Sequence, residues 1–322
     1  MIRVISPTEL VTFAFVALVL ILTTIFRDGL DVASILLNAA ILLGSVAVVN
    51  IIRARIDTKA VRMLHTFYIL FIAIFVFKTV EKLSFALHGR DYDNILIAAD
   101  RAIFGGANPT VWLYQHIPVM PLFVEFLQIC YFMYYFLPII LAIEFFIRRR
   151  RDNRDVHKID EIEMLRFVVI YGLLTSYIGY LILPAIGPRF TLHEFWSIST
   201  ELPGVFLTEP LRWFINLGEN IRTGMTNMQA AQCVTRDAFP SGHTEITLLT
   251  IILAIRYKAR SRWLILFIGS GLIFSTVYLR YHYVIDVIGG SLFAVITLYT
   301  SEPVMKFFLR LKAKILKELR KV

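Results

Sequence analysis

The sequence predicts an all-α, polytopic membrane protein, and three observations lead to this fold class. Of the 322 residues, 57% are hydrophobic and 18% are charged, whereas a soluble domain averages about 45–50% apolar and about 25% charged residues. The mean hydropathy is +0.69. The apolar residues also gather in runs long enough to cross a bilayer core of about 30 Å as helices. This composition excludes soluble globular, collagen-like, disulfide-scaffold and low-complexity proteins.

Eight apolar runs are predicted to be transmembrane helices. They comprise residues 8–26, 31–52, 64–86, 118–147, 164–184, 242–257, 263–280 and 283–301. The first run is not a cleavable signal peptide, because no small-residue cleavage site follows it. The third run carries three charged residues near its end, Lys78, Glu81 and Lys82. We interpret these as a locally paired group at the interface; the alternative is that they face a polar cavity.

The basic residues predict the orientation of these helices. In an eight-span arrangement, 23 of the 33 Lys and Arg residues fall on one side of the membrane, and seven lie in the loops of the other side. The larger group is concentrated in segments 53–62, 148–166, 256–262 and 302–322. By the positive-inside rule, both termini face the cytoplasm. The same rule accounts for the net charge of +9, so a nucleic-acid partner is not expected.

The chain is expected to have three parts. Residues 1–117 contain N-terminal transmembrane helices and an outer loop, residues 118–301 form the core, and residues 302–322 form a basic cytoplasmic tail. The pattern of segment 312–321 predicts a basic amphipathic helix. Anionic lipid of the inner leaflet is its expected partner, and a protein partner is the alternative.

Two loops on the outer face are long, 87–117 and 185–241. In the second loop Pro210 marks a helix start, and apolar residues follow at helical spacing: Leu211, Phe214, Leu217 and Ile221. This stripe predicts a short helix that lies on the membrane surface.

Three short motifs lie at the outer ends of the predicted helices. Residues 187–189 (Gly-Pro-Arg) follow the fifth span, and residues 240–244 (Pro-Ser-Gly-His-Thr) begin the sixth. Residues 280–286 (Arg-Tyr-His-Tyr-Val-Ile-Asp) join the seventh span to the eighth. The motifs are far apart in the sequence, yet the topology places all three at one membrane face. This shared position predicts that they form a single site.

The residue types in the first two motifs suit the binding of a phosphoryl group. His243 lies in the first turn of a predicted helix, where free amides and the helix dipole favour an anion. Gly242 allows a close approach of the backbone, and Ser241 either caps the helix or binds an oxygen. Arg189 can bind two phosphate oxygens with its planar guanidinium; the alternative is an interfacial anchor.

The third motif adds a second histidine. His282 and Asp286 are four residues apart, so a helix would place them on one face. Asp286 would then orient the imidazole and support its charge, while one histidine attacks and the other protonates the leaving oxygen. The outer loops do not contain a cluster of carboxylates of the kind that binds two metal ions. We therefore expect no metal and no other cofactor.

The stretch 240–243 and the pair His282 and Asp286 resemble the motifs of the type-2 phosphatidic acid phosphatase superfamily, which contains lipid phosphatases and phosphotransferases. The resemblance covers residues 164–301 and implies a six-helix, lipid-phosphatase-like core. The phosphatases carry Lys, Pro and Arg at three positions that here are Ile182, Phe190 and Thr276. Arg280 is the candidate substitute, so phosphate binding would rest on Arg189, Arg280 and the helix dipoles.

The stretch 280–287 is similar to the sphingomyelin synthases and the inositol phosphorylceramide synthases. This resemblance implies transfer of a phospho-head-group from a lipid phosphate donor to a lipid or polyol hydroxyl acceptor. It implies that His282 is the nucleophile, Asp286 its orienting partner, and His243 the general acid and later the base. The site would face the periplasm, the exterior or an organelle lumen.

Three other functions compete with this one. A lipid-phosphate phosphatase, acting on phosphatidic acid or on polyprenyl phosphates and diphosphates, would use the same site. The intact His243, His282 and Asp286 argue against a non-catalytic lipid scramblase or transporter. A vanadate-dependent haloperoxidase has a similar site, but those enzymes are soluble and the predicted spans argue against it.

Overall fold

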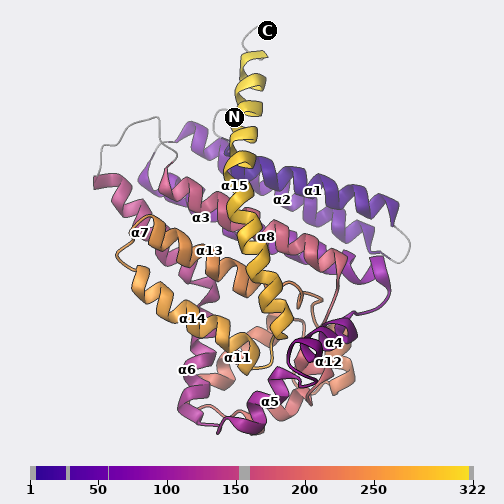
Figure 1. Ribbon diagram of the computed structural model, residues 1–322. Helices are drawn as coiled ribbons and strands as arrows, with labels where there is room; N and C mark the ends of the chain where they lie inside the picture. The colour runs from indigo at the N-terminus through magenta and orange to yellow at the C-terminus, as the bar shows by residue number, and fades with distance from the viewer. Residues whose placement is uncertain (1–4, 27–29, 57, 152–159, 319–322) are drawn as a thin grey trace.

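The computed structural model describes residues 5–26, 30–56, 58–151 and 160–318, and the regular elements in these ranges are helices throughout. Figure 1 shows long helices packed side by side, with shorter helices gathered at one end of the bundle. The predicted all-α class is confirmed.

Each predicted span coincides with a helix or a helix pair. Seven are single helices: α1 (Pro7–Ile25), α2 (Val32–Arg55), α3 (Lys59–His88), α8 (Glu161–Ile182), α13 (Gly242–Arg256), α14 (Arg262–Tyr278) and α15 (Val284–Glu318). The predicted span 118–147 is broken into α6 (Pro121–Phe132), a 3-10 turn η1 (Met133–Tyr135) and α7 (Leu137–Arg151). The two halves are bent by 52°.

Length and hydropathy qualify four helices in the described residues as membrane spans on their own: α1, α2, α8 and α15. The bent pair α6 and α7 is a fifth if it is counted as one span. Helices α13 and α14 have 15 and 17 residues, fewer than the roughly 20 that a straight crossing needs. The chain is therefore a polytopic helical membrane protein, and the number of eight crossings stays a prediction.

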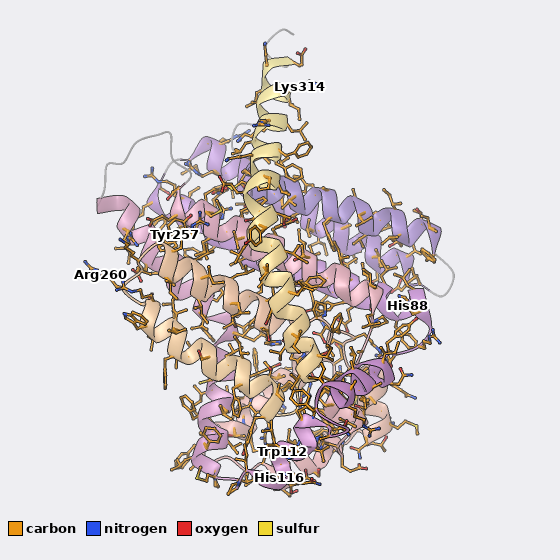
Figure 2. All side chains as sticks on the ribbon, viewed as in Figure 1. His88, Trp112, His116, Tyr257, Arg260 and Lys314 are labelled. Atoms are coloured by element: carbon orange, nitrogen blue, oxygen red, sulfur yellow. The ribbon has the colours of Figure 1, made fainter. Side chains whose placement is uncertain are left out.

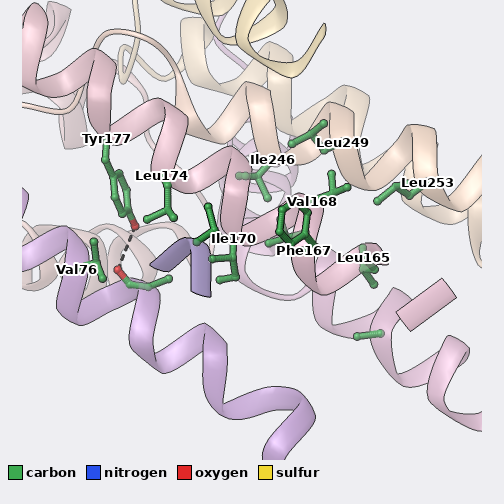
Figure 3. Close-up of a cluster of buried hydrophobic side chains, with 14 of the residues drawn as sticks. Val76, Leu165, Phe167, Val168, Ile170, Leu174, Tyr177, Ile246, Leu249 and Leu253 are labelled. Carbon is green, nitrogen blue, oxygen red and sulfur yellow. Dashed lines mark hydrogen bonds between the residues drawn. The ribbon is translucent and has the colours of Figure 1, made fainter. Parts of the chain in front are cut away.

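Helix α8 lies at the centre of the bundle, where it packs against α1, α3, α7, α13 and α15. Figure 3 shows Phe167 of α8 and Leu249 of α13 in the buried cluster between these helices. The hydroxyl of Tyr177 donates to the carbonyl oxygen of Ala73 in α3 at 3.1 Å. At Gly172, an added Cβ would lie 2.7 Å from Leu249 Cδ1. Because lipid is as apolar as these side chains, close packing and interhelical hydrogen bonds stabilise the bundle.

The short helices α4, α5, α11 and α12 lie at the lower end in Figure 1. The bounds of the short elements are α4 (Asp93–Ile103), α5 (Pro109–His116), α9 (Pro188–Thr191), η2 (Phe195–Ser197), α10 (Ile198–Glu201), α11 (Thr208–Gly218) and α12 (Asn227–Cys233). Figure 2 places Trp112 and His116 at this end, Lys314 at the top and Arg260 at the left edge of the molecule.

Two expectations outside the core can be compared with the helices. The predicted surface helix corresponds to α11, which begins at Thr208 instead of Pro210. Phe214 and Leu217 of the predicted stripe are exposed, whereas Ile221 lies beyond the end of the helix and is buried. The basic C-terminal segment is not a separate element, because α15 continues through Pro303 to its end. Its last turns project beyond the bundle in Figure 1.

We expect Cys233 to react from the outside of intact cells. Cys130 is buried, whereas Cys233 is exposed in α12 at the predicted outer end. A membrane-impermeant maleimide should therefore label the wild-type chain and leave a Cys233→Ser variant unlabelled. Arg260→Cys introduced into that variant should react only after permeabilisation, because its loop belongs to the basic side. The reverse order of labelling would contradict the predicted orientation.

Candidate active site

The N-terminus of α13 presents free backbone amides next to a histidine. Ser241 is the N-cap, and its Oγ accepts the Thr244 N–H at 3.2 Å. Among the described residues, the amides of Gly242 and His243 have no hydrogen-bond partner. Such first-turn amides, together with the helix dipole, attract an anion. Glycine is needed at 242 for packing, because an added Cβ would lie 2.4 Å from the Tyr180 hydroxyl.

The two histidines lie side by side although 39 residues separate them. Nε2 of His282 is 3.3 Å from Nδ1 of His243, and Nδ1 of His282 is 2.9 Å from the Ala238 carbonyl oxygen. Because a carbonyl oxygen can only accept, the proton of His282 belongs on Nδ1. Nε2 then carries a lone pair directed at His243, which is the form that a nucleophile requires.

Asp286 connects the two histidine motifs. Its Oδ2 lies 3.4 Å from Nδ1 of His282 and accepts the backbone N–H of Tyr283 at 2.8 Å. Its backbone oxygen accepts the N–H of Ser241 at 2.9 Å. Because α15 begins at Val284, the contact with the imidazole arises across the start of the helix and not along one helix face.

Arg189 is connected to His243 by a column of stacked rings. Its side chain is buried, and its Nη2 donates to Glu219 at 2.6 Å. The guanidinium lies 4.4 Å from the centre of the Tyr281 ring. Tyr281 stacks on Tyr131 at 3.9 Å, and Tyr131 stacks on His243 at 4.6 Å. A guanidinium has five N–H donors, so one carboxylate does not saturate it and phosphate oxygens can still bind.

Arg280 makes its side-chain contacts away from this column. It is only 1% exposed, pairs through Nη1 with Glu201, and lies over the Tyr114 ring at 4.7 Å. These contacts lie on α10 and α5, which carry none of the three motifs. The structure brings the other predicted residues together and gives the predicted phosphate-binding role of Arg280 no support.

Two carboxylates near the histidines have no counterpart among the residues predicted from the sequence. Burial raises the pKa of Asp237 above its usual value, and the charge of Glu219 adds to this while His282 opposes it. Burial lowers the pKa of His282, which Asp237 opposes. Burial thus favours the neutral imidazole of His282, which is the form that attack requires. Asp237 lies six residues before His243 in a loop, and Glu219 follows α11, so neither has a spacing that marks it.

An apolar cavity of about 450 Å³ lies between α5, α14 and the start of α15. Its walls include Trp112, Phe274, Val277 and Val284. Val277 and Val284 flank the loop that carries His282 in the chain. The volume is within the range of about 300–1,000 Å³ that ligand pockets occupy, and an apolar lining suits a hydrocarbon chain.

Fold and site together define a class of protein. A helical membrane bundle carries, at one end, a histidine pair, a buried arginine and free helix-terminal amides, which are groups that bind and transfer a phosphoryl group. The chain matches the family model of the PAP2 superfamily over residues 94–300 and so belongs to this superfamily. It is an integral-membrane enzyme of the lipid phosphatase or phosphotransferase type. No curated protein and no solved structure matches the chain.

The extent of the match differs from the predicted core. It begins at residue 94, ahead of the predicted core at 118–301, and so includes most of α4 and all of α5. The match identifies the superfamily and not the sphingomyelin synthase branch within it.

Proposed function

We propose that the protein is a lipid phosphotransferase that moves a phospho-head-group from a donor lipid to a hydroxyl acceptor through a phosphohistidine on His282. The observation that carries this proposal is the distance of 3.3 Å between Nε2 of His282 and Nδ1 of His243. This distance means that a buried nucleophile and a proton donor are close enough to act on the same phosphate. The outer loops supply most of the surrounding residues, so the site would face the outer side of the membrane.

In the first half-reaction, the donor phosphate replaces the contact between the two histidines. The Nε2 lone pair of His282 attacks phosphorus, and the N–P bond forms as the bond to the leaving oxygen breaks. His243 enters this step as an imidazolium and gives its Nδ1 proton to that oxygen, so the lipid part of the donor departs as an alcohol and His243 is left neutral. Arg189 and the free α13 amides bind the non-bridging oxygens and stabilise the charge that develops on them.

In the second half-reaction, an acceptor hydroxyl attacks the phosphorus of the phosphohistidine. His243 now takes the hydroxyl proton, the N–P bond breaks, and His282 regains its lone pair. The apolar cavity, whose walls include the residues Val277 and Val284 on either side of the His282 loop, supports a lipid as a reactant, because its volume and lining suit a hydrocarbon chain.

The choice between a lipid acceptor and water rests on the positions that differ from the phosphatases. Ile182 and Thr276 have uncharged side chains, so neither supplies the cation that a phosphatase carries there. The backbone oxygen of Thr276 accepts the N–H groups of Tyr281 and His282 at 2.8 and 2.9 Å. The backbone of Thr276 therefore supports the loop of the nucleophile, and the similarity of the 280–287 stretch favours a transferase.

We expect a new phospholipid to form when the purified protein receives a labelled phospholipid donor together with diacylglycerol, ceramide or an inositol-bearing lipid. Release of the free phospho-head-group, which is inorganic phosphate only when the donor is a lipid phosphate, should fall as the acceptor concentration rises, because water and the acceptor hydroxyl compete for one phosphohistidine. The measurement follows lipid products and the released phospho-head-group over time, in vesicles with and without acceptor. Equal release in both, with no new lipid, would identify a phosphatase. No product from any donor would favour the non-catalytic alternative.

A further inference from the structure

Helix α4 carries two buried aspartates that no sequence motif marks. Asp93 is its first residue, and Asp100 lies two turns later on the same face. Their side chains belong to residues that are only 6% and 1% exposed. A buried carboxylate is tolerated only when donors satisfy its oxygens, so the partners of these two aspartates show what α4 holds in place.

Asp93 joins two of the three motifs. Its Oδ2 accepts the N–H of Ile186 at 3.0 Å, and its Oδ1 accepts the N–H of Gly187 at 2.8 Å. Oδ1 also accepts the hydroxyl of Tyr283 at 2.8 Å. Gly187 lies two residues before Arg189, and Tyr283 follows the nucleophile directly. A single carboxylate thus holds together the loop that precedes Arg189 and the loop that carries His282.

Asp100 holds the first turn of α15. Its Oδ2 accepts the Val284 N–H at 3.0 Å, and its Oδ1 accepts the Ile285 N–H at 2.8 Å. Asp286 accepts the preceding N–H, that of Tyr283, at 2.8 Å. Carboxylates therefore bind three successive amides where the helix dipole favours negative charge. This end of α15 is closed to a phosphate anion, which leaves the start of α13 as the anion site.

We propose that Asp93 and Asp100 are positioning residues, through which α4 sets the distance between the Arg189 guanidinium and Nε2 of His282. Their hydrogen bonds go to backbone amides and to the Tyr283 hydroxyl, and not to the imidazole rings, so they act by holding the loops in place. The proposal rests on the proposed phosphotransfer, because it concerns the geometry of that same site.

Asp93→Asn is expected to lower kcat about 100-fold, because misplacing reacting groups by about 1 Å costs that much. The asparagine keeps the size of the side chain but turns an NH₂ group toward backbone N–H donors, which separates the two loops. KM should change less than about threefold, since the loss falls on the chemical step. The measurement is steady-state kinetics with a labelled phospholipid donor, with the thermal midpoint of the purified protein recorded in parallel.

Asn94→Asp is the matched control, because it makes the reverse exchange at the next residue, on the exposed face of α4. Its kcat should stay within about twofold of wild type, as for most surface substitutions. Tyr283→Phe removes the bond of the hydroxyl to Asp93 and its contact with the Thr191 hydroxyl, and should lower kcat about fivefold or more. Combined with Asp93→Asn, it should add little, because both changes break the same contact.

The outcomes are distinguishable. An inactive wild-type protein refutes the proposed function and, with it, the positioning role. An active wild type with a folded Asp93→Asn variant whose kcat is unchanged, or whose loss appears only in KM, refutes the positioning role alone. If Asp93→Asn does not fold, Tyr283→Phe decides: a fall in kcat supports the proposal, and an unchanged kcat overturns it.

Discussion

His282→Ala is expected to lower turnover by about 10⁴-fold or more, the loss seen when the nucleophile of a covalent mechanism is removed. Without the imidazole no N–P bond can form, and both half-reactions stop. The variant should still fold, because the motifs remain tied by the bond from the Ser241 N–H to the Asp286 oxygen. The bonds of Asp93 to Gly187 and Tyr283 also persist.

The measurement is a rapid-quench experiment with a phosphoryl donor labelled on phosphorus. The wild-type chain should retain label that survives alkali and is lost in acid, as a phosphoramidate bond behaves. His282→Ala should retain none. His116→Ala is the control, because His116 is exposed at the same end of the molecule and stacks on Trp112; it should keep both label and turnover. Label retained by His282→Ala would assign the nucleophile to another residue.

The meeting of the two histidines could be predicted because each stands at the end of an apolar helix. His243 begins α13, and His282 lies in the short connection between α14 and α15. The short loop after α13 makes α14 run back antiparallel to α13. The start of α13 and the end of α14, where the two histidines lie, are therefore at the same end of the bundle. Charge patterning and helix length therefore predict the place of the site, and the chemistry of the residue types predicts what it binds.

The break in the predicted span 118–147 had a signal of its own. Pro138 has no N–H to donate to the preceding turn, so α6 ends and a helix restarts near it. The continuous apolar composition of this run, from which the span was predicted, carries no information about such a bend. The same reasoning fails for Pro303, where α15 continues without interruption.

Contacts between distant polar residues could not be predicted. The partner of Arg280 is Glu201, and the partner of Arg189 is Glu219. Nothing in the local pattern distinguishes one arginine from the other, because ion pairs depend on how the loops pack. In the sequence, Asp93 likewise has the position of an ordinary acidic residue in the first turn of a helix. Only the fold shows that its oxygens accept hydrogen bonds from residues of two motifs.

His243→Ala is expected to lower turnover about 10²–10⁴-fold with a lipid phosphate, the range that general acid–base catalysis contributes. The loss should be much smaller with an aryl phosphate. An alkoxide must gain a proton as its bond to phosphorus breaks, whereas a nitrophenolate leaves without one. His282→Ala should lose activity with both substrates, because each needs the nucleophile. The two variants thereby separate proton transfer from covalent attack.

The measurement is the ratio of turnover with the two substrates in the wild type and in each variant. His243→Gln serves as a second variant, because the His243 ring lies between Tyr131 and Tyr134 at 4.6 and 4.3 Å and alanine leaves that space empty. Glutamine fills more of it but cannot donate a proton as an acid. Both variants should show the same dependence on the leaving group. Equal losses with both substrates would mean that His243 binds the phosphate without protonating the leaving oxygen, and unchanged turnover of the lipid phosphate would remove it from the mechanism.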